Sequence, residues 1–509
     1  MQTQTQMLTK RSWIVFVLLF LCMQFIANAQ SSPLVPKDIT LEQKRYVAPL
    51  IYDPVLYPLP IVQLRINGSA PLLFMIDTGY SFPLIIDNVI AKQLKLTANG
   101  RRFDIHHGTI VGDMANVDHV EIVCATDDAK HSLSYPLQVD SVVMEANMLP
   151  TGFPSPSPIA GIIGMPALSS ATVTFDFAAK TLTLLPTDQV PLKIKGTAIL
   201  SLKPLDTRFT VALPAGDKII DFVLDTGSQW VVIPEKNASR FKFSVTPPVI
   251  TGEWSITGLH NVNVRLLSDF LIGNRHEPDV VAHTVGEDEQ PSLIGMSVLS
   301  RFRMTIDAQH RQLLLEPNTD YAARCRLPGL PCVLVARKQD HYSVYDVLPA
   351  SSAEQAGVRI GDTILSVDGQ STTALPEETV QLLLDGIADK QAELVLLRQD
   401  NSKQSIHYKR QSLFAMASGR EIGVGIGIAV TEAGKMLVTA LQQRSPATEA
   451  GIQVGDEIVL IAGLPVRTTL MAQLAQEMKK PEGTVIILKL LRRSDNKLYE
   501  VKLTVRKLL

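Results

Sequence analysis

Phe222 to Ser228, which read Phe-Val-Leu-Asp-Thr-Gly-Ser, decide the fold of this chain together with an earlier stretch. That stretch, Phe74 to Tyr80, reads Phe-Met-Ile-Asp-Thr-Gly-Tyr. In each case an apolar run typical of a buried strand ends at Asp-Thr-Gly. A buried carboxylate without a partner is costly, so two such endings predict that the carboxyl groups of Asp77 and Asp225 meet at one site.

A pair of adjacent carboxyl groups has a defined chemistry. Two carboxyl groups about 3 Å apart cannot both ionise easily, so the pKa of one falls and that of the other rises. The ionised group can take a proton from a water while the protonated group donates to a carbonyl oxygen. That is general acid–base hydrolysis of an amide without a covalent intermediate, and it makes Asp77 and Asp225 the candidate catalytic residues.

The residues after each Asp are expected to support this site. Gly79 and Gly227 allow the backbone to approach closely and to turn sharply. The hydroxyl groups of Thr78 and Thr226 are expected to link the two loops by hydrogen bonds. Ser228 is placed to hydrogen-bond Asp225.

Each Asp-Thr-Gly recurs with the same surroundings, which indicates an internal duplication. Each is expected to end the returning strand of a hairpin: Leu59 to Asn67 with Leu72 to Ile76, and Phe209 to Leu213 with Ile219 to Leu224. Each is followed by an apolar-apolar-Gly motif, a short helix and two strands, in Ile159 to Leu185 and in Pro291 to Glu316. The period of about 140 residues is that of a domain rather than of a solenoid repeat.

These motifs resemble those of retroviral-type (retropepsin-like) aspartic proteases, in which Asp-Thr/Ser-Gly is followed by apolar-apolar-Gly. Viral members build one site from two identical chains, whereas this chain has both halves between Ile51 and Pro317. The resemblance implies a mainly β fold, in which two acid-protease lobes form an intrachain pseudo-dimer. It also implies a monomeric aspartic endopeptidase that uses Asp77 and Asp225, needs no cofactor and acts on proteins or peptides.

Two other interpretations stay open. Asp-Thr-Gly also occurs in ordinary turns. The residue after the Gly is usually small in the family; Ser228 fits that rule, whereas Tyr80 is bulky and is followed by Ser81. The alternative to an enzyme is therefore an inactive protease fold that binds peptides as an adaptor.

Between the two motifs of each lobe, the family carries a flap, a hairpin that closes over the substrate. The candidate in the first lobe is His107 to Gly112, with Gly108 and Gly112 as hinges. The candidate in the second lobe is Gly252 to Gly258, in which Trp254 is expected to cover the substrate and Gly258 to act as a hinge. A plain surface hairpin is the alternative for both.

A different repeat, with a period of about 94 residues, follows Pro317. Leu348 to Asp362 and Arg444 to Asp456 each contain small residues, then Ala-Gly, then Gly-Asp, which predicts a short helix, a C-cap and a turn before a strand. This pattern resembles the PDZ domain, twice. The second helix of each copy is expected at Glu377 to Leu384 and at Leu470 to Lys479.

A PDZ domain binds an extended peptide as an added strand, and backbone N–H groups of one loop hold the peptide carboxylate. In the second copy this loop is Gly423 to Ile428, so Gly425, Ile426 and Gly427 are the candidate peptide-binding residues. In the first copy Pro331 removes one N–H donor from the corresponding loop. A structural role is therefore the alternative to peptide binding for the first copy.

The composition indicates a large folded protein and argues against some kinds of partner. The chain has 509 residues, of which 46% are hydrophobic, so it can form several domains with large cores. The formal net charge is -2 and no basic block with interleaved aromatic residues occurs, so nucleic acid is not an expected partner. The sequence contains no metal-ligand cluster and no phosphate-binding glycine loop, so neither a metal nor another cofactor is expected.

The N-terminus predicts an exported protein. Lys10 and Arg11 precede the apolar run Trp13 to Leu21, and Ala27-Asn-Ala29 fits a signal-peptidase site. The mature chain would then start at Gln30 and lie in the periplasm or outside the cell, with contact to the membrane only through the signal peptide. An uncleaved membrane anchor is the alternative, although the apolar run is short for a span. Cys325 and Cys332 can pair as a disulfide in such a compartment.

The resulting domain organisation is a signal peptide over residues 1–29 and an N-terminal arm over 30–48. Two retropepsin-like lobes follow over 49–187 and 188–318, and two PDZ domains over 319–411 and 412–509.

Overall fold

The computed structural model describes most of the chain after residue 44. The described residues are 45–54, 56–104, 111–125, 133–145, 158–186, 196–244, 249–255, 258–285, 291–318, 327–329, 332–348, 351–414, 423–430, 435–466, 477, 480–493 and 495–507. They form a mainly β fold with a few short helices. Within these ranges, no helix has the length and the apolar character that a membrane crossing needs. The predicted signal peptide and Cys325 lie outside the described residues.

The first lobe, defined here as β1 to β13, places Asp77 at the end of a central strand. β3 (Tyr57–Ile66) and β4 (Leu72–Asp77) form the predicted hairpin, and Asn67 in its turn has a φ of 49°. β4 is hydrogen-bonded to β3 on one side and runs parallel to β11 (Gly161–Gly164) on the other. The other elements of this lobe are β1 (Tyr46–Pro49), β2 (Ile51–Asp53), β5 (Leu84–Asp87), α2 (Asn88–Gln93), β6 (Ala98–Asp104), β7 (Val111–Asn116), β8 (Val120–Cys124), β9 (Leu133–Leu137), β10 (Ser141–Glu145), α3 (Met165–Leu168), β12 (Ala171–Asp176) and β13 (Thr181–Pro186).

The second lobe, defined as β14 to β25, repeats this arrangement around Asp225. β15 (Arg208–Ala215) and β16 (Lys218–Leu224) form the hairpin, and β16 runs parallel to β23 (Ser292–Ile294). The short helix predicted after the apolar-apolar-Gly motif is α5 (Met296–Leu299). The other elements are β14 (Ala198–Leu205), β17 (Val231–Pro234), α4 (Glu235–Ala238), β18 (Val249–Ser255), β19 (Gly258–Leu267), β20 (Phe270–Ile272), β21 (Arg275–Glu277), β22 (Val280–Val285), β24 (Phe302–Asp307) and β25 (Gln312–Pro317).

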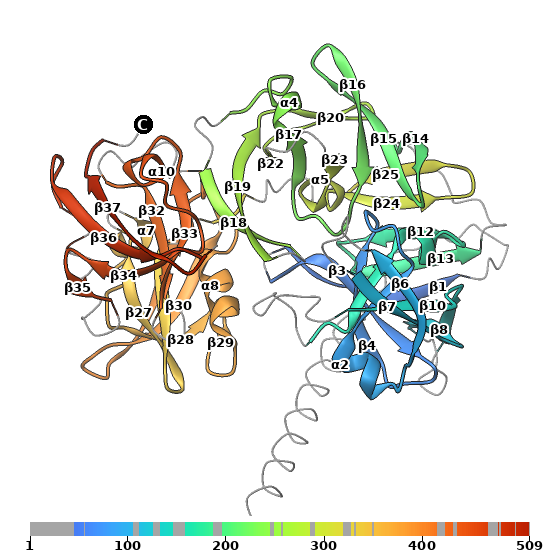
Figure 1. Ribbon diagram of the computed structural model, residues 1–509, viewed down its shortest axis with the longest axis horizontal. Helices are drawn as coiled ribbons and strands as arrows, with labels where there is room; N and C mark the ends of the chain where they lie inside the picture. The colour runs from blue at the N-terminus through green and yellow to red at the C-terminus, as the bar shows by residue number, and fades with distance from the viewer. Residues whose placement is uncertain are drawn as a thin grey trace, which may run out of the picture. The chain divides into compact units, whose positions relative to one another are not determined.

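The two lobes share a sheet, in which β12 of the first lobe pairs antiparallel with β24 of the second (Figure 1). At the centre of this pairing Thr174 lies opposite Thr305, and their hydroxyl oxygens are 2.8 Å apart. β13 and β25 extend the sheet on either side, and β1 and β14 are its outer strands. The equivalent positions of Thr174 and Thr305 in the two repeats give the sheet an approximate two-fold symmetry.

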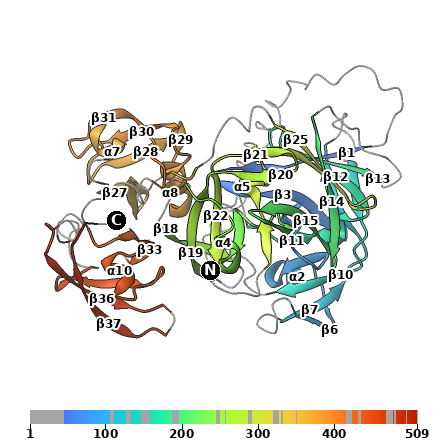
Figure 2. The ribbon, with the colours of Figure 1, turned by 90° about the horizontal axis from the view of Figure 1, so that it is seen from above.

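The region after β25 contains the two predicted PDZ repeats. The first contains β26 (Val333–Lys338), β27 (His341–Val347), α7 (Ser352–Gln355), β28 (Thr363–Val367), β29 (Gln370–Ser371), α8 (Glu377–Asp385), β30 (Gln391–Leu397) and β31 (Lys403–Lys409); α7, β28, β30 and β31 are visible in Figure 2. The second contains β32 (Ile426–Val430), β33 (Met436–Gln442), α10 (Pro446–Glu449), β34 (Glu457–Ile461), β35 (Leu464–Pro465), β36 (Val485–Leu491) and β37 (Leu498–Thr504). The predicted helix at Leu470 to Lys479 lies outside the described residues except for Glu477, which is helical.

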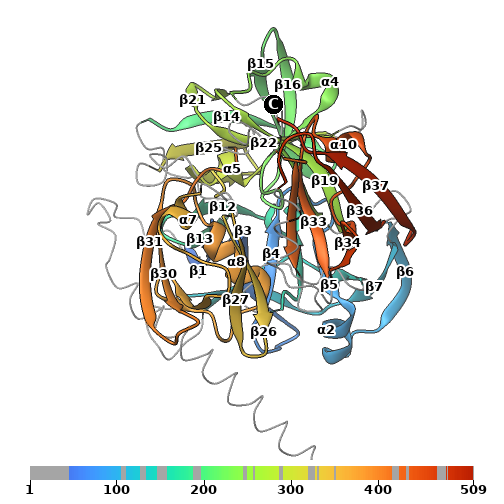
Figure 3. The ribbon, with the colours of Figure 1, turned by 90° about the vertical axis from the view of Figure 1, so that its left-hand side faces the viewer.

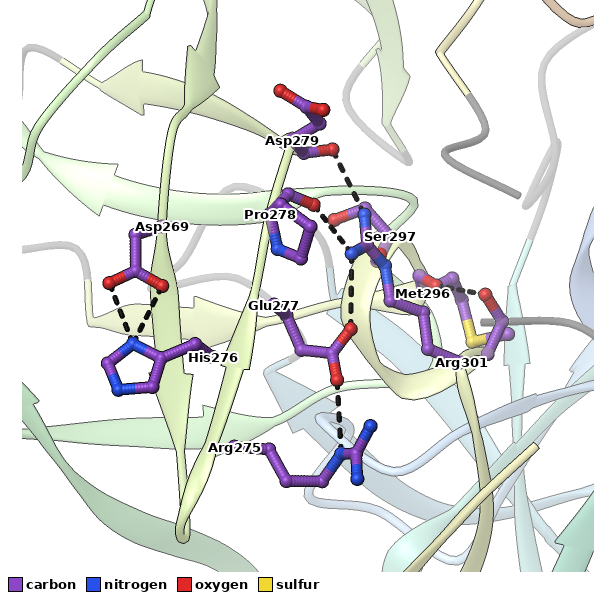
Figure 4. Close-up of polar contacts among 10 residues, drawn as sticks. Asp269, Arg275, His276, Glu277, Pro278, Asp279, Met296, Ser297 and Arg301 are labelled. Carbon is purple, nitrogen blue, oxygen red and sulfur yellow. Dashed lines mark hydrogen bonds and ion pairs between the residues drawn. The ribbon is translucent and has the colours of Figure 1, made fainter. Parts of the chain in front are cut away.

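A buried arginine fixes α5 within the second lobe (Figure 4). Arg301 Nε donates to Ser297 O in α5 at 2.9 Å, and its Nη1 lies 3.3 Å from Glu277 Oε2 at the end of β21. The same guanidinium group donates to the carbonyl oxygens of Pro278 and Asp279 at 2.7 and 3.0 Å. Arg275 also contacts Glu277, through Nε, at 3.3 Å. Arg301 thus holds the helix that follows the apolar-apolar-Gly motif against the strand behind it.

We expect Arg301→Met to destabilise the second lobe by on the order of 3 kcal/mol, because it removes donors from three carbonyl groups and leaves the buried Glu277 carboxylate short of a partner. Calorimetric unfolding of the mature chain measures this loss. Arg240→Met is the matched control, since Arg240 pairs with Asp217, whose side chain is 81% exposed. Such exposed pairs contribute about 1 kcal/mol or less. Equal transition temperatures for the two variants would contradict the assigned role.

Candidate functional site

The two Asp-Thr-Gly loops meet through four reciprocal hydrogen bonds. Thr78 N donates to Thr226 Oγ1 at 3.1 Å, and Thr226 N donates to Thr78 Oγ1 at 3.0 Å. The Thr78 hydroxyl donates to Leu224 O, and the Thr226 hydroxyl donates to Ile76 O, both at 2.8 Å. Both threonines are buried. The cross-link expected from the sequence is therefore present, and each threonine reaches the residue that precedes the Asp of the other loop.

The glycines of the two loops face the carboxyl groups of the opposite loop. A Cβ added at Gly79 would lie 2.5 Å from Asp225 Cγ, and one added at Gly227 would lie 2.3 Å from Asp77 Cγ. No side chain fits at these distances, so the close approach requires glycine at both positions. The arrangement brings the two predicted carboxyl groups together, with a hydrogen bond between their side chains.

Burial raises the pKa of both carboxyl groups, and repulsion from Asp225 raises that of Asp77 further. The pKa of Asp77 lies well above its usual value, because the carboxyl group is desolvated and faces the charge of Asp225. Desolvation also raises the pKa of Asp225, but its hydrogen bond with Asp77 and the backbone N–H groups of Gly227 and Ser228 oppose that rise. Gly227 N donates to Asp225 Oδ1 at 2.8 Å. The surroundings of Asp225 therefore stabilise its charged form more than those of Asp77 do.

One oxygen of the Asp77 carboxyl group is buried without a hydrogen-bond partner in the described part of the chain. Asp77 Oδ1 is buried and has no hydrogen-bond partner among the residues that the structure describes. A buried carboxyl oxygen without a partner is unfavourable, and a bound water or a carbonyl group would satisfy it.

Arg208 is a charged neighbour of the site that the sequence motifs did not indicate. It begins β15, and its Nη1 donates to Gly79 O of the opposite loop at 3.3 Å. Its positive charge lowers the pKa of Asp77 and of Asp225. The register of the two hairpins places Leu59 at the position of the first lobe that is equivalent to Arg208. No recurring pattern could therefore have revealed it.

The residues after the two Asp-Thr-Gly triplets differ, as the sequence suggested. Tyr80 is partly buried, packs against the core of the two lobes, and donates its backbone N–H to Asp77 O at 3.2 Å. The expected hydrogen bond from the Ser228 side chain to Asp225 is absent, because the hydroxyl donates to Trp230 O at 2.9 Å. The backbone N–H of Ser228 bonds Asp225 instead.

The flap candidates coincide with hairpins. In the first lobe β6 and β7 pair, and Gly112 lies opposite Phe103, while Gly108 lies outside the described residues. In the second lobe β18 pairs with β19, with Trp254 opposite Leu259 and Gly258 at the start of β19. Paired strands therefore border the first candidate, of which residues 107–110 lie outside the described part of the chain, and form the second. Whether Trp254 covers a substrate stays a prediction.

The candidate carboxylate loop of the second PDZ repeat precedes an edge suited to a peptide. Gly425 has a φ of 77°, and Ile426 and Gly427 begin β32, which pairs with β33. Gly423 exchanges two backbone hydrogen bonds with Arg506, which fixes the start of the loop. Cys332, at the end of the corresponding loop in the first repeat, is buried, and its Sγ lies 3.5 Å from Gln411 Oε1. The disulfide to Cys325 stays a prediction. The described part of the chain holds no group of three or more acidic, His or Cys side chains arranged for a metal.

Comparison with known families identifies the C-terminal repeats. The PDZ domain model matches residues 343–398 and 437–492, so the chain contains two PDZ domains. Among solved structures, the chain is similar to basic 7S globulin from soybean at 9% identity, over 54% of this chain and 95% of that chain, with a TM-score of 0.36. It is also similar to a photosystem II D1 C-terminal processing protease at 27% identity, over 19% and 26% of the two chains, with a TM-score of 0.16. Neither likeness is close enough to carry an argument about the first 320 or so residues.

We expect Thr226→Val to destabilise the contact between the lobes, because the isosteric side chain leaves Thr78 N and Ile76 O without their partner. The loss should be on the order of 2 kcal/mol in unfolding free energy, measured by urea denaturation of the mature chain. Thr210→Val is the control, since the buried hydroxyl of Thr210 makes only a 3.5 Å contact with Lys203 O inside the second lobe. A loss no larger than that of the control would contradict the proposed importance of the cross-link.

We expect Arg208→Met to raise the pKa of both carboxyl groups, because it removes a positive charge that favours their ionised forms. The pH dependence of the ¹³C shifts of the Asp77 and Asp225 carboxyl carbons measures this directly. Arg240→Met, which removes an arginine that pairs with the exposed Asp217 instead, should leave both titrations unchanged. A shift toward lower pH in Arg208→Met would refute the electrostatic role.

Proposed function

We propose that the chain is an exported, retropepsin-like aspartic endopeptidase whose two lobes form one site within a single chain. The proposal rests chiefly on the buried pair of carboxyl groups, both with a raised pKa, at the ends of β4 and β16. A protein that only binds peptides has no need of two desolvated carboxyl groups that share a proton. Strongly perturbed titratable groups of this kind are typical of catalytic sites.

The geometry supports a division of roles between the two carboxyl groups. The ionised Asp225 would take a proton from an attacking water, and its charge is held by the N–H groups of Gly227 and Ser228. The protonated Asp77 would donate to the oxygen of the scissile carbonyl group, as that oxygen becomes negative. The threonine cross-link keeps the two groups in register, and the hairpins β6–β7 and β18–β19 are placed in sequence where a flap would exclude water.

Peptide binding by the PDZ domains is the second part of the proposed function. PDZ domains in general bind peptide tails, so recruitment of substrates or control of access is their proposed role here. The proposal also includes export to the periplasm or the cell exterior, because the N-terminal segment of the sequence has the features of a signal peptide. Proteins or peptides are the proposed substrates, and the protease unit is proposed to act as a monomer.

We expect the mature chain from Gln30 to cleave an unstructured protein such as casein, and either Asp77→Asn or Asp225→Asn to abolish cleavage. Because one proton must be shared, cleavage should fall as the pH rises through the upper pKa of the pair, and again as it drops below the lower one. The assay is product release from casein between acidic and neutral pH. Asp221→Asn is the control, since this exposed carboxyl group on β16 pairs with Lys203.

Cleavage that survives both active-site variants would disprove the mechanism. No cleavage by the unaltered chain at any pH would favour the adaptor, for which the bulky Tyr80 after the first Asp-Thr-Gly is the supporting observation.

A further inference from the structure

The groove of the first PDZ domain lies between β26 and α8, which are neighbours in Figure 3. In a PDZ domain, a bound peptide adds itself as a strand to the free edge of such a strand. β26 pairs with β27 along its other edge, and Lys338 lies opposite His341 and Ala336 opposite Ser343. Alternate residues of a strand serve opposite edges. The backbone groups of Val333 and Arg337, four positions apart, therefore point to the same edge.

That edge is already bonded by side chains of α8. Gln381 Nε2 donates to Val333 O at 3.0 Å, and Arg337 N donates to Glu377 Oε2 at 3.2 Å. These two backbone groups, one C=O and one N–H, are of the kind that an added strand needs. Glu377 and Gln381 are one helical turn apart, so both side chains lie on the face of α8 that is turned to β26.

The amide of Gln381 is itself held in place. Its Nε2 also donates to Asp385 Oδ1 at 2.7 Å, one turn further along α8. With its two N–H groups directed to Val333 and Asp385, the amide spans the space between helix and strand. A peptide strand would have to displace it, and Glu377 as well, before pairing with β26.

The second PDZ domain has different residues at these positions. Gly361-Asp362 and Gly369 of the first copy recur as Gly455-Asp456 and Gly463, and β30 recurs as β36 at the same spacing, so the sequence between them aligns without gaps. Glu377 and Gln381 then align with Met471 and Ala475. Neither methionine nor alanine has the amide or carboxylate that forms the bonds in the first copy.

We propose that Glu377 and Gln381 close the groove of the first PDZ domain, and that the second PDZ domain alone receives an extended peptide. The inference deepens the peptide-binding part of the proposed function and is independent of proteolysis. The Gly425 to Gly427 loop and β32 of the second domain then form the receptive site. There Tyr345 Oη of the first domain donates to Ile428 O at 3.5 Å, and a bound peptide displaces this contact.

The closed groove is testable without a ligand, by amide hydrogen exchange on the full mature chain. Glu377→Ala should speed exchange of the Arg337 amide at least tenfold, because it removes the acceptor of that N–H. Glu393→Ala, at an exposed position of β30 in the same domain, should leave it unchanged. An unchanged Arg337 amide in Glu377→Ala, with the rest of the domain still protected, would overturn the closure.

Peptide binding is tested on an Asp225→Asn background, so that cleavage plays no part in the result. The probe is a phage library of random heptapeptides with a free C-terminal Leu or Val, selected on the full chain. We expect a selected peptide to protect amides of β32 and not those of β26. Glu377→Met with Gln381→Ala, which copies the second domain, should add protection at β26. Met471→Glu with Ala475→Gln should weaken binding to the second domain at least tenfold.

Protection of β26 in the chain with Glu377 and Gln381 intact would overturn the proposal. So would the failure of all three chains to select any peptide, because the second domain would then not be a receptor. Neither result bears on casein cleavage by the chain with both aspartates, so the protease proposal and the groove proposal fail separately.

Discussion

The reciprocal hydrogen bonds between Thr78 and Thr226 determine how the two lobes meet. Each threonine uses its backbone N–H and its hydroxyl on the opposite loop, so these four groups are satisfied inside the protein. Because an aspartate precedes each threonine, the same bonds place two carboxyl groups face to face and remove them from water. The raised pKa of the two carboxyl groups is thus a consequence of the contact between the two Asp-Thr-Gly loops.

The two halves of this contact are not equivalent. Asp225 accepts N–H bonds from Gly227 and Ser228, whereas Asp77 accepts one from Gly79, so the backbone itself favours the charge on Asp225. Arg208 adds a positive charge on one side only. In a site built from two identical chains, both halves have the same residues, so any feature of one half is also present in the other. Because both halves lie in one chain, that constraint is absent, and the two carboxyl groups can have different surroundings.

The features that could be predicted from the sequence are those that a short motif, or the repeat of a motif along the chain, encodes. The Asp-Thr-Gly hairpins and the helices after each apolar-apolar-Gly were predicted at or near their observed places, because each depends on neighbours in the chain. The threonine cross-link joins distant loops, and it was predicted because the Asp-Thr-Gly motif occurs twice. Arg208 was missed, since its role arises from a contact with a loop of the other lobe. The Ser228 hydroxyl was given the wrong partner, because two acceptors lie within its reach and sequence does not rank them. The bonds from α8 to β26 depend likewise on side chains that meet only in the folded domain.

The central sheet also bears on the order in which the chain can fold. One edge of β12 pairs with β13, which follows it directly in the chain. The other edge pairs with β24, in which Thr305 lies 131 residues after its β12 partner Thr174. During synthesis the first lobe therefore presents an unpaired strand edge until most of the second has left the ribosome. Such an edge is a template for pairing with another nascent chain. Long-range pairing of this kind also slows folding. A chaperone that holds the unfolded chain would therefore benefit this protein more than it would benefit a protein with mainly local contacts.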